Sequence, residues 1–234
     1  MDRKAKVSPV IPPSSFDFLT RLKDNNNREW FQAHKDRFLE EQSAIEAFAG
    51  ALLEQLNTHD QLETPDGKSA LQRIYRDTRF SKDKTPYKTY WGGGFRRATR
   101  YRRGGYYFHF EPGGRSFAGG GFWGPNAADL KLIREDIAFD PSPLNKVLNS
   151  RNFKAIFGTL QGEQLKKAPQ GFDPAHEAIG LLRYKQFLLR RPFTDAEVLA
   201  PSFLKEVGQT YKHMRPFLDY MSGILGADAN GLPL

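Results

Sequence analysis

The sequence predicts an α+β fold with a mainly antiparallel sheet flanked by N-terminal and C-terminal helices. Apolar residues recur at helical spacing before residue 58 and again after residue 126, and short β-rich runs with glycine-containing turns lie between these regions. Strands bracketed by helices, without regular βαβ alternation, are typical of α+β proteins. Short connections favour antiparallel hairpins, because a parallel return needs about a dozen residues.

The composition indicates a globular chain with one hydrophobic core. Of 234 residues, 39% are hydrophobic and 13% are aromatic, which is too rich for a disordered chain. Cysteine is absent, which excludes disulfides, thiolate zinc sites, iron–sulfur clusters and cysteine nucleophiles.

The predicted organisation is a single α+β domain at 15–222, with a flexible leader at 1–14 and a flexible tail at 223–234. The leader is polar and basic and contains three prolines. The chain has neither the apolar core of a signal peptide nor the roughly 20 apolar residues of a membrane span. We therefore expect a cytoplasmic protein that does not enter membranes.

The first helices are predicted from caps and spacing. Ser15 can cap a short helix over 16–22, and Asn27 can cap one long or broken helix over 28–57. Trp30 and Phe31, at the start of that second helix, are interpreted as core residues.

Strands are predicted in the middle of the chain. Residues 71–80 have a strand-like pattern, and the segment after them has turn chemistry, because Pro86 fixes its own φ angle. Three further β-rich runs follow, at 89–98, 105–112 and 116–124.

The last third of the chain is mostly helical by pattern. One more strand is predicted within 181–193, and Pro216 is expected to kink the last helix. The predicted helices are 127–138, 142–150, 152–157 and 202–221. No internal repeat is present.

The positive charge is local. The formal net charge is +8, but residues 73–115 hold twelve Lys or Arg against three acidic residues, so the rest of the chain sums to −1. A local basic field suits an anionic partner, although a solvated basic surface would have the same composition.

The segment 73–88, RIYRDTRFSKDKTPYK, predicts an anion site. Guanidinium groups bind phosphate bidentately, lysines add point charges, and a turn offers backbone N–H groups. In a strand, Arg73, Asp77 and Arg79 would share one face, and Arg76 would lie on the other with Ile74 and Phe80. The candidate ligand-binding residues are Arg73, Arg76, Arg79, Lys82, Lys84, Tyr87 and Lys88. The alternative is an internal Arg–Asp network.

A second group lies in the run 105–124. Tyr107, His109 and Glu111 would share one face of a strand, where His109 and Glu111 could transfer protons. The candidate catalytic residues are therefore Asp77, His109 and Glu111. The alternative is a polar cluster that bonds the sheet to a helix. Glycines 119–121 match no phosphate-binding motif, so they indicate close backbone packing or a bulge.

No metal or cofactor is predicted. The five histidines are scattered and form no HExxH motif, and no Asp and Glu cluster suggests magnesium. The chain also lacks the G-x-S-x-G motif of serine hydrolases.

The segments RDTRFSKDKTPYKT, NNNREWF, YYFHFEPGGRSFAGGGFW and LLRYKQF resemble the bacterial and fungal family called domain of unknown function 2461. The resemblance runs over about residues 16–222. It implies no activity, substrate or catalytic residue. The shared positions are Asn26, Trp30, Phe31, Arg76, Asp77, Arg79, Phe80, Ser81, Asp83, Lys84, Pro86, Tyr87, Lys88, Glu111, Gly119, Gly120 and Gly121.

Three functional hypotheses follow. The first is binding of a phosphate-bearing small molecule or nucleic acid by the basic segment, with exposed Tyr87 or Tyr90 available for stacking. The second is an enzyme acting on a small anionic substrate, which requires one pocket that joins the two groups. The third is an interaction protein in which the basic segment is internal. The sequence does not determine the oligomeric state.

Overall fold

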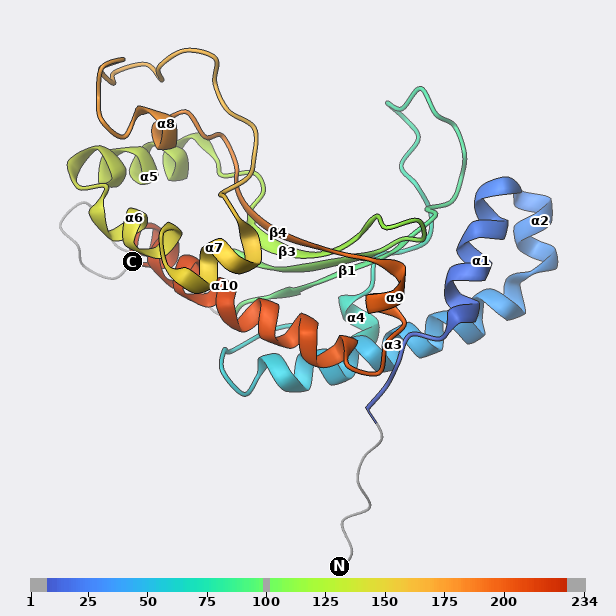
Figure 1. Cartoon of the computed structure of the whole chain (residues 1–234). Coiled ribbons are helices and arrows are strands. Elements are labelled where there is room, and N and C mark those ends of the chain that lie inside the picture. The colour runs from blue at the N-terminus through green and yellow to red at the C-terminus, as the bar shows by residue number, and fades with distance from the viewer. Residues whose placement is uncertain (1–7, 99–101, 227–234) are drawn as a thin grey trace, which may run out of the picture. The chain divides into compact units, whose positions relative to one another are not determined.

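The computed structural model describes residues 8–98 and 102–226 (Figure 1). It confirms the α+β class, because helices precede and follow a four-stranded antiparallel sheet with the order β1-β2-β3-β4. The strands are β1 (Trp91–Arg96), β2 (Gly105–Phe110), β3 (Ser116–Phe122) and β4 (Phe187–Phe193). The helices before the sheet are α1 (Pro13–Asp24), α2 (Arg28–Ala33), α3 (Lys35–Leu56) and α4 (Gly67–Ala70). Those that follow β3 are α5 (Ala127–Phe139), α6 (Ser142–Leu148), α7 (Arg151–Phe157), α8 (Ile179–Leu182), α9 (Asp195–Val198) and α10 (Phe203–Leu225).

The longer helices and the four strands lie where the sequence predicts them. The helix predicted over 28–57 is broken at His34, which ends α2 and precedes α3. Three four-residue helices, α4, α8 and α9, were not predicted, because so short a segment holds too few residues to show helical periodicity.

The predicted strand over 71–80 is wrong. This segment makes only isolated antiparallel bridges, from Leu71 to Gly93 and from Tyr75 to Tyr87. Pro86 has no N–H to donate to a ladder, and side-chain carboxylates bond the neighbouring backbone instead. The predicted sharing of faces fails with the strand, since Ile74 is 8% exposed and Phe80 is 95% exposed.

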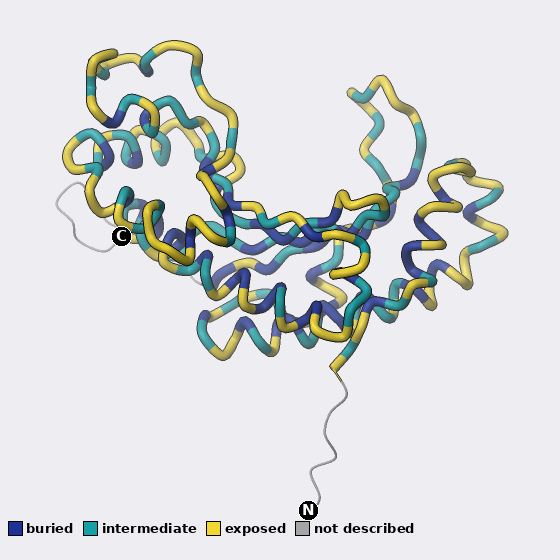
Figure 2. Tube along the Cα trace, in the orientation of Figure 1, coloured by how far each residue is buried: buried dark blue, intermediate teal, exposed yellow. Residues whose placement is uncertain are grey.

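The chain divides into two compact units. Unit 1 contains Met1–Phe95, Tyr107–Ala118 and Pro192–Gln209, and unit 2 contains Arg96–Tyr106, Gly119–Arg191 and Thr210–Leu234. Buried residues gather on the strands and on α3 and α10, whereas the segment 73–88 is mostly half-buried or exposed (Figure 2).

The core of unit 1 is aromatic. The Phe48 ring of α3 packs edge-on against Phe110 of β2 and stacks on Phe203, with ring centroids 5.6 Å apart in both pairs. In β2, Phe108 and Phe110 are buried while Tyr107 and His109 are half-buried, which confirms the predicted alternation. The core therefore lies on one side of the strand, and the chemically reactive side chains lie on the other.

Close approach of backbones shapes both units. A Cβ atom on Gly67 would lie 2.2 Å from the Glu46 carbonyl oxygen, so α4 can pack on α3 only with glycine there. In unit 2, Gly121 has φ +120° and lies against the Phe187 carbonyl, and Gly120 lies against the Gly105 carbonyl. The prediction that this glycine run serves close backbone packing is confirmed.

Parts of the predicted leader and tail lie outside the described residues, namely 1–7 and 227–234. Within the predicted leader, Ile11 is buried and α1 begins at Pro13. In the part of the chain that the structure describes, no helix combines the length and the apolar character needed to span a bilayer.

Candidate anion-binding groove and the neighbouring aromatic cluster

A groove of about 840 Å³ lies in unit 1, between the basic segment 73–88 and the start of α2. Polar and cationic side chains make up much of its wall. It is lined by Asn26, Asn27, Arg28, Gln32, Tyr75, Arg76, Thr78, Lys84, Thr85, Pro86 and Tyr87.

Three consecutive asparagines build one wall, and each has a different role. The Asn25 side chain donates to the Arg21 carbonyl at the end of α1, and the Asn27 side chain caps α2 by accepting from the Trp30 N–H. Between them, Asn26 donates to the Tyr87 carbonyl at 2.9 Å and accepts from the Tyr87 N–H at 3.0 Å. The side chain of Asn26 therefore clamps the basic segment to the α1–α2 turn.

Tyr87 anchors the basic segment in the core. Tyr87 is 3% exposed, and its ring stacks on Phe31, with centroids 4.1 Å apart. The prediction that Tyr87 is an exposed stacking residue is therefore wrong. The exposed aromatic residue of the groove is Tyr75, which is 59% exposed and makes a tilted ring contact with Tyr87, with centroids 5.5 Å apart.

The tip of the basic segment is ordered by its own carboxylates. Asp77 accepts from the Arg79 guanidinium and from the Arg79 N–H, and these bonds lower the pKa of Asp77 to about 2. Asp83 accepts from the Thr85 N–H and from Arg76, and these bonds lower its pKa to about 2 as well. Both carboxylates are therefore ionised at neutral pH.

The cations of the groove differ in their partners. Arg76 is paired with Asp83 and also donates to Thr85. Lys84 donates to the Thr78 carbonyl at 2.8 Å. No hydrogen bond or ion pair joins the Arg28 side chain to another described residue, and none of the described carboxylates pairs with Lys84. Two charges that face the groove are therefore not neutralised there.

The structure brings together three of the seven predicted ligand-binding residues. Arg76, Lys84 and Tyr87 line the groove, whereas Arg73, Arg79, Lys82 and Lys88 do not. Arg79 is occupied by Asp77, and Lys88 donates to Gln72 and to the Arg73 carbonyl. Burial, with a smaller contribution from Arg73, lowers the pKa of Lys88.

Sequence reasoning missed Arg28 and Tyr75 as groove residues. Arg28 is the first residue of α2, where the helix dipole favours an acidic side chain over a basic one. A cation at this unfavourable helix position was the sequence feature that could have identified Arg28 as a candidate binding residue. Nothing local distinguishes Tyr75 from Tyr87, because their opposite orientations depend on Phe31.

The second predicted group forms an aromatic cluster in unit 1. The His109 ring lies between Tyr90 and Phe117, with centroid distances of 4.0 and 5.0 Å. His109 Nε2 lies 2.8 Å from Glu111 Oε2, and Glu111 Oε1 accepts from Arg115 Nε at 2.7 Å. The predicted proximity of His109 and Glu111 is therefore confirmed, and no role follows from it alone.

The tyrosine hydroxyls of this cluster are partly withdrawn from water. Burial raises the pKa of Tyr107 to about 12. Burial, and then the negative charge of Glu111, raises the pKa of Tyr90, whereas the positive charge of Arg76 lowers it.

The two predicted groups adjoin but do not share one cavity. Lys88 Nζ lies 5.9 Å from the centroid of Tyr90, which stacks on His109. No residue of β2 or β3 is among those that line the groove. The third catalytic candidate, Asp77, is 60% exposed, pairs with Arg79 and also lies outside the lining.

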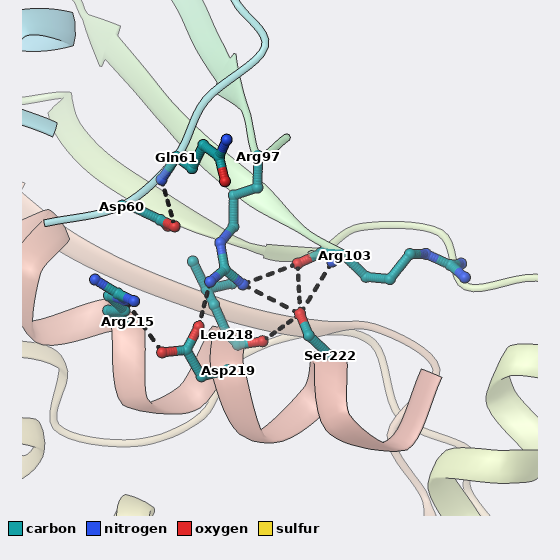
Figure 3. A network of polar contacts seen from close by, with 8 residues as sticks. All are labelled: Asp60, Gln61, Arg97, Arg103, Arg215, Leu218, Asp219 and Ser222. Carbon is teal, nitrogen blue, oxygen red and sulfur yellow. Dashed lines mark hydrogen bonds and ion pairs between the residues drawn. The ribbon is translucent and has the colours of Figure 1, made fainter. Parts of the chain in front are cut away.

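A buried Arg–Asp network is present, but it lies in unit 2 rather than in the basic segment (Figure 3). The Arg97 side chain is 1% exposed and donates to Asp219 and to Ser222. Ser222 also accepts from the Arg103 N–H at 3.0 Å. The Arg–Asp pairs of the basic segment are instead solvent-accessible, with side-chain exposures from 26% to 76%.

Among the described residues, no group of three or more His, Asp or Glu side chains is arranged to hold a metal ion.

Comparisons with known proteins identify the family of the chain. Neither the curated proteins nor the solved structures gave a match. A family model described as "Conserved hypothetical protein (DUF2461)" matches residues 14–220, which is most of the chain. The match includes the asparagine turn, the basic segment and the aromatic cluster. The chain therefore belongs to the DUF2461 family of conserved hypothetical proteins.

Proposed function

We propose that the groove of unit 1 binds a phosphate-bearing ligand. The observation that carries this proposal is that Arg28 and Lys84 face the same cavity as Arg76 without a carboxylate partner among the described residues. Uncompensated charges in a concave site concentrate positive potential and attract anions. Guanidinium and ammonium groups form their strongest hydrogen bonds with ionised oxygens such as those of phosphate.

The remaining lining suits an organic phosphate. A volume of about 840 Å³ falls within the range of small-molecule sites. Tyr75 is 59% exposed, and its ring is braced by a tilted contact with the Tyr87 ring, with an interplanar angle of 45°. Because a braced ring loses little conformational freedom on binding, it is a suitable platform for a planar group. These features favour a nucleotide over inorganic phosphate.

Isothermal titration calorimetry with thymidine monophosphate and with inorganic phosphate tests the proposal. Replacing Arg28 by Ala or Lys84 by Met is expected to weaken thymidine monophosphate binding by about tenfold or more, since each removes a charge-assisted hydrogen bond. Lys68→Met is the matched control, because Lys68 is an exposed lysine of α4 that does not line the groove.

Equal decreases in thymidine monophosphate affinity in Lys84→Met and Lys68→Met would show that binding depends only on the net charge of the protein. That result would contradict a site in the groove. Absence of binding of both probes to the wild-type protein would contradict the proposal directly.

The second hypothesis, an enzyme acting on a small anionic substrate, requires one pocket that joins the basic segment to His109 and Glu111. Neither His109 nor Glu111 is among the residues that line the groove, so this function is not proposed.

A further inference from the structure

We infer that the phosphate-bearing ligand is a strand of single-stranded nucleic acid, with one base on Tyr75 and another on Phe80. This inference rests on the proposed function of the groove. Its main observation is Phe80, which is 95% exposed at the tip of the basic segment. Exposed aromatic rings interleaved with cations are typical of single-strand binding, because every base presents a face on which a ring can stack.

Phe80 belongs to an ordered turn whose residues Thr78 and Lys84 line the groove. The Ser81 N–H donates to the Thr78 carbonyl, and Lys84 Nζ donates to the same oxygen. Thr78 and Lys84 both line the groove. Phe80 lies two residues beyond Thr78, so their Cα atoms are at most about 7 Å apart. A ligand seated in the groove can therefore extend onto Phe80.

The turn also holds the neighbours of Phe80. Arg79 is fixed by Asp77 at 2.7 Å, and its guanidinium carbon lies 5.9 Å from the centroid of Phe80. The segment therefore presents the ring on an organised loop. Such presentation lowers the entropy cost of binding, because the loop is ordered before the ligand arrives.

Cations outside the groove extend the same positive field. The side chains of Arg73 and Lys82 belong to the basic segment but do not line the groove, and no ion pair joins either of them to another described residue. A mononucleotide carries a single phosphate and would occupy Arg28 and Lys84 alone. A strand carries one phosphate for each nucleotide, so it can also neutralise the outer cations.

The contacts favour a strand over an anionic membrane, although a cationic loop with an apolar tip could suit both. Burying a single phenylalanine gives only weak membrane attachment, because stable membrane binding needs more than one such signal. The second exposed ring, Tyr75, lines a groove in which its ring packs on Tyr87. A ring in such a position can stack on a base, but it is not presented as a tip for insertion into lipid.

The test is fluorescence anisotropy with a labelled oligothymidylate of about twelve nucleotides, within the usual site size for such proteins. Thymidine monophosphate binding is measured separately by calorimetry. Phe80→Ala is compared with Phe139→Ala, which removes an equally exposed phenylalanine, 92% exposed at the end of α5. Neither substitution removes a buried side chain, so both variants are expected to fold.

We expect Phe80→Ala to weaken oligothymidylate binding by about tenfold or more, as loss of one stacked base does, and to leave thymidine monophosphate binding unchanged. Phe139→Ala should change neither. Lys82→Met should lower the slope of log affinity against log salt concentration by about one, because one phosphate contact is lost.

Other outcomes overturn the inference and separate it from the proposed function. If thymidine monophosphate binds but the oligonucleotide binds no tighter, the inference of a single-stranded ligand is wrong. It is also wrong if Phe80→Ala does not weaken oligonucleotide binding. In both cases the proposed phosphate site is not contradicted. If neither ligand binds, both proposals fail. If the wild-type protein binds phosphatidylserine vesicles but no oligonucleotide, and Phe80→Ala abolishes vesicle binding, the partner is a membrane and the inference is wrong.

Discussion

At the scale of single residues, Arg97 is a charged side chain held in the interior of unit 2. Its carboxylate partner Asp219 is 47% exposed and also accepts from Arg215 at 3.1 Å. We expect Asp219→Asn to lower the free energy of unfolding by about 2 kcal/mol, because the buried guanidinium loses an ionised acceptor. Arg215→Ala should cost less than about 1 kcal/mol, since its pair is near the surface. Urea unfolding followed by circular dichroism measures the free energy of unfolding of both variants. Equal decreases in the two variants would contradict the expected difference between the buried and the half-buried arginine.

The carboxylates of the basic segment make a second prediction at the residue scale. Their pKa values are lowered from 3.8 to about 2, for Asp77 mainly by the Arg79 side chain and for Asp83 mainly by the Thr85 N–H. A lowered pKa means that the stabilisation is fully present above about pH 3.8 and is lost as the pH falls through about 2. We therefore expect carboxyl-carbon NMR titrations with midpoints near 2.

The matched variant for this titration is Arg79→Ala. It should raise the midpoint of Asp77 and leave that of Asp83 unchanged, since Arg79 bonds only the first of the two. Midpoints near 3.8 in the wild-type protein would mean that the ordered turn around Phe80 does not form in solution.

At the scale of elements, the position of the basic segment depends on the turn between α1 and α2. We expect Asn26→Ala to lower the free energy of unfolding by about 2 kcal/mol, because two backbone groups of Tyr87 lose their partner. Asn27→Ala removes a helix cap and should cost about 1 kcal/mol. Asn25→Ala removes an exposed bond and should cost less than Asn26→Ala. Chemical denaturation of the three variants gives the order.

The same substitution separates stability from function. Asn26→Ala should also weaken thymidine monophosphate binding, whereas Asn25→Ala should not, since Asn25 does not line the groove. If Asn26→Ala and Asn25→Ala have the same effect on both measurements, the clamp does not position the groove.

At the scale of the whole molecule, the charge distribution is more informative than the net charge. Residues 73–115 have a net charge of +9 in a chain of net charge +8, yet the groove uses only Arg76 and Lys84 from this region. Its third cation, Arg28, comes from a part of the chain with no excess of positive charge. Arg97 and Arg103, in contrast, belong to internal contacts of unit 2. The basic composition therefore suggests an anionic ligand, which stays a proposal, and it does not identify the residues that line the groove.

The sequence by itself determined the class of fold, most element positions and the alternation of β2. These features depend on residues within a few positions of one another, such as the cap of α2 by Asn27 and the pairing of His109 with Glu111. Family membership followed from motifs that are likewise local.

Only the tertiary structure decided which residues form the groove. Tyr87 is buried and Tyr75 is exposed because Phe31 and Asn26 hold Tyr87, and Asn26 lies 61 residues away in the chain. The same contact brings Arg28 into the groove with Arg76 and Lys84. The side chains of an irregular loop follow no period, so the orientation of each depends on the distant residues that it packs against and not on its neighbours in sequence.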